Sequence, residues 1–127
     1  MSYYFSRNLE MPFTEAIDRV TTRLKEEGFG VLTEIDVRET LKNKLDVEFR
    51  PYRILGACHP PSAYAALSAE DKIGTMLPCN VIVQERDGGV EVAAIDPVAS
   101  MQAVRNEELG EVANEVRERL KRVVETL

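Results

Sequence analysis

The chain has 127 residues, 44% of them hydrophobic and 30% charged, a balance that indicates one folded domain spanning residues 1–127. Its net charge of −6 repels phosphate groups, so we expect neither a nucleic acid nor an anionic membrane surface as a partner. With no apolar run near the ~20 residues of a membrane span and no secretory signal, we expect a cytoplasmic protein.

The N-terminal segment predicts a strand followed by an amphipathic helix. Residues 3–8 are typical of a short strand. Pro12 is well tolerated at a helix start, and the helix is expected over residues 12–27 until Gly28 ends it. Its apolar residues recur at steps of three and four, as a single buried helix face requires: Phe13, Ala16, Ile17, Val20 and Leu24.

The next segment predicts a second strand and a short helix. Residues 29–37 alternate between apolar side chains and other residues, as a half-buried strand does. Asp36 precedes Glu39 by three residues, which is the spacing of a capping pair at a helix N-terminus. A short helix is therefore expected over residues 37–45.

A third strand is expected over residues 52–58, where β-branched, aromatic and small side chains predominate. Pro61 then begins a short helix that continues to Leu67. The stretch that follows is polar and contains Gly74, so it is expected to be a loop.

Two further strands form a predicted hairpin. The first covers residues 79–86 and the second residues 90–95. The tripeptide Asp87-Gly88-Gly89 between them is typical of a tight turn. Asp96-Pro97 ends the second strand, since proline cannot donate to a strand ladder.

The C-terminal segment has the clearest helix pattern, over residues 106–127. Asn106 is a suitable N-cap, and the pairs Glu115/Arg119 and Glu118/Arg122 are spaced four residues apart on the solvated side. The apolar face comprises Leu109, Val112, Ala113, Val116, Leu120, Val123, Val124 and Leu127.

The predicted order of elements, strand-helix-four strands-helix, favours an α+β fold. We expect an antiparallel sheet of four or five strands with the two long helices packed on one face. The apolar faces of both helices and of the strands would then form one core.

Most signatures of catalysis are missing from the sequence. His59 is the single histidine, so a Ser/His/Asp triad would depend on it alone. Gly28-Phe29-Gly30 is too short for a nucleotide-binding fingerprint, and the aspartates fall at predicted turns and caps. The sequence therefore assigns neither a reaction nor a cofactor, and it leaves open whether the chain is an enzyme.

Two cysteines stand at facing strand ends. Cys58-His59-Pro60 closes one strand and Leu77-Pro78-Cys79 opens the next. If these strands pair antiparallel, Cys58 and Cys79 become neighbours. They are then small buried residues, a redox pair, or, with His59, three ligands of a soft metal ion.

The chain resembles the family known as domain of unknown function 302. The resemblance rests on Glu26-Glu27-Gly28-Phe29-Gly30-Val31-Leu32 with Ile35-Asp36, on residues 52–60 with Ala63, on Gly74, on Leu77-Pro78-Cys79-Asn80-Val81 with Val83, and on Asp96-Pro97. It implies a β-α-β(4)-α fold of the TATA-binding-protein grouping, often a homodimer, and no established activity. The family commonly has Asn where His59 stands, so the resemblance also implies that no metal ligand is required there.

From these observations we expect a non-enzymatic domain that binds a small ligand in a groove between the sheet and the C-terminal helix. The expected lining residues are Cys58, His59, Tyr64, Leu77 and Cys79. The alternatives are a thiol-dependent redox enzyme, in which Cys58 attacks and Cys79 resolves, and a metal-binding protein. A third class is a structural protein that acts only through its homodimer.

We expect the two thiols to be reduced and shielded from solvent. A cytoplasmic location keeps thiols reduced. Alternation along the strands, judged from Ile54 on one and from Val81 and Val83 on the other, predicts that both thiols point toward the helix-covered face.

Overall fold

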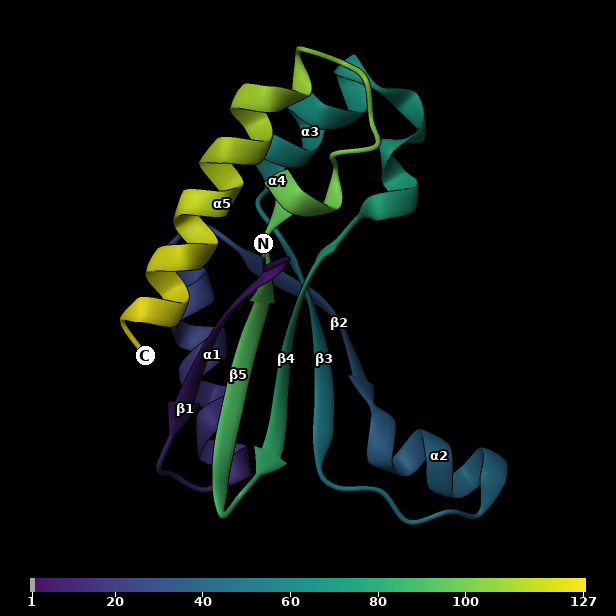
Figure 1. Cartoon of the computed structure of the whole chain (residues 1–127), viewed down its shortest axis with the longest axis vertical. Coiled ribbons are helices and arrows are strands. Elements are labelled where there is room, and N and C mark those ends of the chain that lie inside the picture. Colours follow the sequence, from purple (N-terminus) through teal and green to yellow (C-terminus); the bar gives the residue numbers. More distant parts are fainter. Residues whose placement is uncertain (1) are drawn as a thin grey trace.

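The computed structural model describes residues 2–127 and contains a five-stranded antiparallel sheet (Figure 1). Its strands are β1 (Tyr4–Leu9), β2 (Gly30–Asp36), β3 (Tyr52–Cys58), β4 (Cys79–Arg86) and β5 (Gly89–Ile95). They lie in the order β1-β5-β4-β3-β2, and each neighbouring pair is antiparallel. The α+β fold with the order β-α-β(4)-α is therefore confirmed.

Two long helices, α1 (Phe13–Glu26) and α5 (Leu109–Glu125), pack on the same face of this sheet (Figure 1). Both present the apolar faces that their periodicity predicts. Burying each of these Leu or Val side chains contributes about 1.5–3 kcal/mol. The Leu and Val side chains that are wholly buried in this core are Val20 and Leu24 of α1, Leu120 and Val123 of α5, and Leu55, Val81, Val83 and Val92 of the sheet.

Alternation along the strands divides the side chains of the sheet between two faces. Val81 and Val83 of β4 face the two helices and are fully buried. The residues between and beside them point to the opposite face, which we call the open face. Its apolar side chains remain at least partly exposed, and they include Tyr4, Ile35, Tyr52, Ile54, Ile82, Ala93 and Ile95.

The short helix α2 (Val37–Leu45) has the bounds that the capping pair predicts. The backbone N–H of Glu39 donates to Oδ1 of Asp36 at 2.9 Å, so the expected cap is present. None of the residues of α2 is buried, and the helix projects from the end of β2 away from the core (Figure 1).

Two short helical elements were not expected from the sequence: the 3₁₀ helix η1 (Asp71–Met76) and α4 (Pro97–Ser100). Asp96 does more than end β5, because its Oδ1 accepts the N–H of Val98 at 2.9 Å and so caps α4. Pro97 then occupies the first helical position, where its missing N–H has no consequence.

The C-terminal helix begins later than its N-cap signal predicts. Asn106 accepts the N–H of Glu108 at 3.0 Å through its side chain, and its carbonyl accepts the N–H of Leu109 at 3.1 Å. These bonds form a turn before the helix, which begins at Leu109.

Among residues 2–127 the structure contains no helix that combines the length and the apolar character of a membrane span.

One predicted ion pair on α5 is formed and the other is not. Nη2 of Arg119 lies 3.2 Å from Glu115, as expected. Nη2 of Arg122 lies 3.1 Å from Glu27 at the end of α1, so the predicted Glu118/Arg122 pair is wrong. The side chain of Glu27 is mostly shielded by the packing of α1 against α5, and it offers Arg122 a less hydrated partner than Glu118 does.

Candidate functional site

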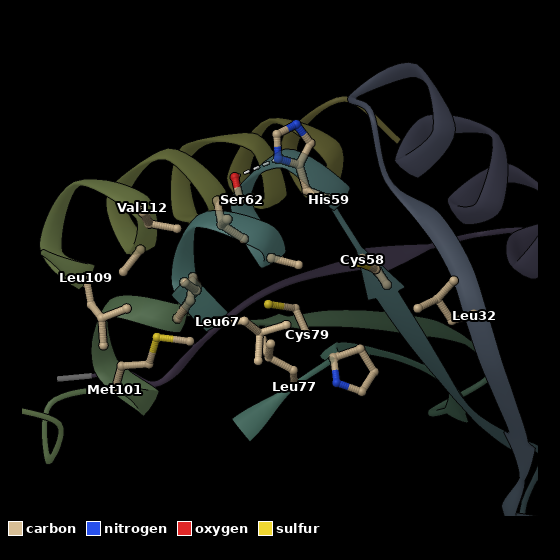
Figure 2. A pocket seen from close by; sticks show the side chains of 17 residues that line it. Leu32, Cys58, His59, Ser62, Leu67, Leu77, Cys79, Met101, Leu109 and Val112 are labelled. Atoms are coloured by element: carbon tan, nitrogen blue, oxygen red, sulfur yellow. Dashed lines mark hydrogen bonds between the residues drawn. The ribbon is translucent and has the colours of Figure 1, made fainter. Parts of the chain in front are cut away.

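An apolar pocket with a volume of about 290 Å³ lies where β3 ends and β4 begins (Figure 2). Its walls come from this end of the sheet, from α3 (Pro60–Ala69), from α4 and from the first half of α5. Most of the lining is aliphatic, including Ala57, Ala66, Leu67, Leu77, Leu109 and Val116. The expected groove between the sheet and the C-terminal helix is thus a cavity at one end of the sheet.

The sequence of α3 leaves room for this cavity. Pro60 and Pro61 begin the helix directly after His59, so that the chain turns back over the sheet end. The residues that α3 turns toward the cavity include Ser62, Ala63 and Ala66. Because these side chains are small, they do not fill the space between α3 and α5 as leucines would.

Gly56 allows β3 and the start of β4 to approach closely at the floor of this region. A Cβ atom at Gly56 would overlap the side chain of Thr33 and lie 2.7 Å from Cγ of Pro78. A side chain here would therefore displace Pro78, which lines the pocket beside Leu77 and Cys79. Gly56 is within the segment that suggests the family, but nothing local in the sequence indicates this contact.

The two cysteines come together at this sheet end, and both are free thiols that line the pocket. Cys79 pairs across the strands with Ala57, the residue that precedes Cys58. Cys79 is buried on the helix-covered face in line with Val81, and its sulfur points into the cavity (Figure 2). Cys58 is only half-buried.

The prediction that both thiols point toward the helix-covered face is wrong for Cys58. The prediction for Cys58 relied on alternation from Ile54. Ile54 pairs with Ile82 and lies on the open face, whereas Leu55 and Ala57 are buried residues of β3. Cys58 alternates with Ala57 and therefore leaves the strand on the other side. It reaches the pocket because β3 ends at this residue.

The thiol of Cys79 is uncharged at neutral pH. Burial, and then the neighbouring Cys58, raises the pKa of the Cys79 thiol from 9.0 to about 11. A buried thiolate would lose its hydration without gaining a cation, so the protonated form is preferred. Cys79 therefore contributes a small, neutral and mainly apolar surface to the pocket.

His59 and Ser62 form the polar corner of the pocket (Figure 2). Nδ1 of His59 lies 2.6 Å from Oγ of the buried Ser62. The imidazole also packs against the ring of Phe29, with 5.7 Å between ring centroids. Burial, and then the positive charge of Arg119, lowers the pKa of His59 below 6.5, while Glu115 has a weaker opposite effect. The imidazole is therefore neutral at pH 7.

Four of the five residues expected at a ligand site line this pocket, namely Cys58, His59, Leu77 and Cys79. The fifth, Tyr64, lies on α3 with 77% of its surface exposed and takes no part in the lining. Helix α3 turns Ala63 and Ala66 inward, and the intervening Tyr64 consequently faces solvent.

The sequence analysis did not assign several of the lining residues to a ligand site. Leu109, Val112, Ala113 and Val116 belong to the predicted apolar stripe of α5, whose periodicity indicates burial but not a cavity. Ser62 lies three residues after His59, at the start of a helix, and this spacing is the sequence signal that indicates their contact. Met101 follows α4, an element that the sequence analysis missed.

Within residues 2–127 there is no group of three or more His, Cys, Asp or Glu side chains positioned to hold a metal ion. Cys58, His59 and Cys79 thus do not converge as a ligand set.

Two wider hollows are more polar than the apolar pocket. One, of about 770 Å³, surrounds the β4–β5 turn and includes Glu10, Arg50 and Arg86, and the other, of about 420 Å³, lies on the open face.

Comparison with known proteins covers nearly the whole chain. Residues 5–127 match the family described as "Domain of unknown function DUF302". A crystal structure of an uncharacterised conserved DUF302 protein from Bacillus stearothermophilus is 28% identical in sequence, and the match covers 98% of each chain with a TM-score of 0.91. No curated protein matches this chain.

Proposed function

This chain belongs to the DUF302 family, and from its apolar pocket we propose that it is a non-enzymatic domain that binds a small molecule. The pocket itself is the observation that supports this function. Its volume of about 290 Å³ is close to the lower end of the range of roughly 300–1,000 Å³ for small-molecule sites. Such sites are mostly apolar with a few polar groups, and this lining has that character.

The pocket is a partly open hollow, and the side chains that line it leave this space unfilled. Side chains inside a protein normally interdigitate and leave few voids larger than one water molecule. The volume corresponds to roughly ten waters at ~30 Å³ each, and the aliphatic walls offer those waters few hydrogen bonds. A ligand with an apolar body would release poorly bound water, which favours binding.

Binding is better supported than a thiol-dependent redox reaction. In the redox alternative Cys79 resolves the bond that Cys58 forms, and a resolving thiol must also attack as the thiolate. A pKa of about 11 leaves roughly one Cys79 thiol in ten thousand ionised at pH 7. A thiol of such high pKa is also a poor leaving group in thiol–disulfide exchange. We place the domain in the cytoplasm, where the surroundings keep both thiols reduced.

The proposal is tested by filling the pocket from its rim. Ala63 lines the pocket, whereas Ala65, on the same helix, is exposed and outside the lining. We expect Ala63→Phe to weaken binding of the neutral fluorescent probe N-phenyl-1-naphthylamine by about tenfold or more, and the control Ala65→Phe to bind it like the native chain. Fluorescence titration measures both affinities.

Native mass spectrometry of the protein purified without organic solvent provides a second measurement. A retained small molecule that is lost in Ala63→Phe but kept in Ala65→Phe would support the pocket as its site. Equal probe affinity in the native chain and both variants, with all three folded by circular dichroism, would contradict the proposed function.

A further inference from the structure

The lining of the pocket also restricts the chemistry of its ligand. Given the proposed function, on which this inference rests, we propose that the pocket selects uncharged molecules with an apolar body and one hydrogen-bonding oxygen, which the Ser62–His59 pair holds. Fatty alcohols and neutral carbonyl compounds belong to this class.

The first support is that the pocket offers no charged partner. None of its 17 lining residues is Asp, Glu, Lys or Arg. Transferring an ionic head group from water into such surroundings is unfavourable unless an opposite charge or several hydrogen bonds compensate it. An anionic or cationic ligand would therefore lose much of the affinity that its apolar body gains.

The titratable groups in the lining do not change this conclusion at neutral pH. Burial and Arg119 lower the pKa of His59, so the imidazole is neutral. Burial and Cys58 raise the pKa of Cys79 to about 11, so its thiol is protonated. The pocket thus presents neutral groups at the pH at which a cytoplasmic protein works.

The charged residues nearest to His59 are already paired with each other. Nη2 of Arg119 lies 3.2 Å from Glu115, and Nη1 of Arg119 donates to the carbonyl of Glu27 at 2.9 Å. Neither Arg119 nor Glu115 lines the pocket. Nε of Arg119 is buried without a hydrogen-bond partner among residues 2–127, but Arg119 lies outside the lining, so neither charge is presented to a ligand in the pocket.

The second support is the hydrogen-bonding capacity of Ser62. A hydroxyl has one donor hydrogen and two acceptor lone pairs, and the contact with Nδ1 of His59 uses only one of them. Ser62 is buried, so bulk water has little access to the remaining capacity. A ligand oxygen in the pocket is suited to this role, because it restores the hydrogen bond that burial removes.

A series of ligands with one tail and three head groups tests the inference. The ligands are 1-octanol, octanoate and octylamine at pH 7.5, and the readout is displacement of N-phenyl-1-naphthylamine from the native chain. We expect 1-octanol to bind at least about tenfold more tightly than either ion. Octanoate or octylamine binding as tightly as 1-octanol would overturn the inference and leave the pocket a binding site.

The role of Ser62 is tested with a matched pair of serine variants. Ser62→Ala removes the buried hydroxyl, and Ser68→Ala removes an exposed hydroxyl from the same helix. We expect Ser62→Ala to weaken 1-octanol binding several-fold more than it weakens probe binding, and Ser68→Ala to change neither. Unchanged 1-octanol affinity in Ser62→Ala would overturn the role of the pair. Failure of the probe and all three ligands to bind would instead overturn the proposed function itself.

Discussion

At Cys79, the removal of water and the nearby Cys58 act in the same direction on the thiol and raise its pKa to about 11. The ordinary value of 9.0 applies to the unfolded chain, so the unfolded state loses this proton at a lower pH than the folded state does. The stabilising contribution is therefore complete below about pH 9 and is lost as the pH rises toward about 11. Cys79 thus links stability to pH on the alkaline side.

We expect Cys79→Ala to remove this part of the pH dependence. The difference in unfolding free energy between the native chain and Cys79→Ala should shrink by about 1–3 kcal/mol between about pH 8.5 and pH 11. Urea unfolding at a series of pH values measures that difference, and Cys58→Ala, at the half-buried cysteine, is the matched control. Parallel pH profiles for the native chain and Cys79→Ala would show that Cys79 is not shielded.

The two halves of α5 have different surroundings although they share one apolar stripe. In the C-terminal half, Leu120 and Val123 are fully buried in the core formed with α1 and the sheet. In the N-terminal half, Val112 and Val116 line the pocket. The helix therefore anchors the fold at one end and forms a wall of the cavity at the other.

Truncation of Leu120 measures how firmly this helix is docked. We expect Leu120→Ala to lower the unfolding free energy by about 2–5 kcal/mol, because the cavity that it leaves cannot collapse fully. Lys121→Ala is the control, since its pair with Glu125 is exposed and contributes little. Denaturant unfolding compares the two variants, and a cost near zero for Leu120→Ala would mean that α5 does not pack as described.

At the scale of the whole molecule, the two long helices cover one face of the sheet and leave apolar side chains partly exposed on the other. Tyr52, Ile54 and Ile82 remain partly exposed on the open face, and β1 and β2 are the two edge strands of the sheet. Proteins commonly cover such surfaces by association with a second copy. We therefore expect a homodimer in solution.

Light scattering at micromolar concentration checks this expectation. The expected species has twice the 14.3 kDa mass of the chain. Ile82→Glu, which places a charge on the open face, is expected to shift the protein toward the monomer, whereas Leu67→Glu at the pocket rim is the control for a charge elsewhere. A native chain found only at 14.3 kDa would contradict the homodimer.

The sequence by itself determined the elements whose signals are local. The bounds of the strands at residues 52–58 and 79–86 and of the helix at residues 37–45 agree with the structure, because alternation, proline positions and the Asp36 cap act within a few residues. The adjoining strand ends also followed from chain order once the strands paired antiparallel. Four of the five residues expected at a ligand site line the apolar pocket, which forms at these strand ends.

Only the tertiary structure decided the direction of Tyr64, the face of Cys58 and the partner of Arg122. Each depends on how far one element rotates or approaches another, and no local pattern encodes that distance. The cavity has the same origin, since small side chains on α3 face α4 and α5 across a space that none of these segments defines alone. A void is the difference between the volume that the backbone encloses and the volume that the side chains fill, so it exists only after all the elements have packed.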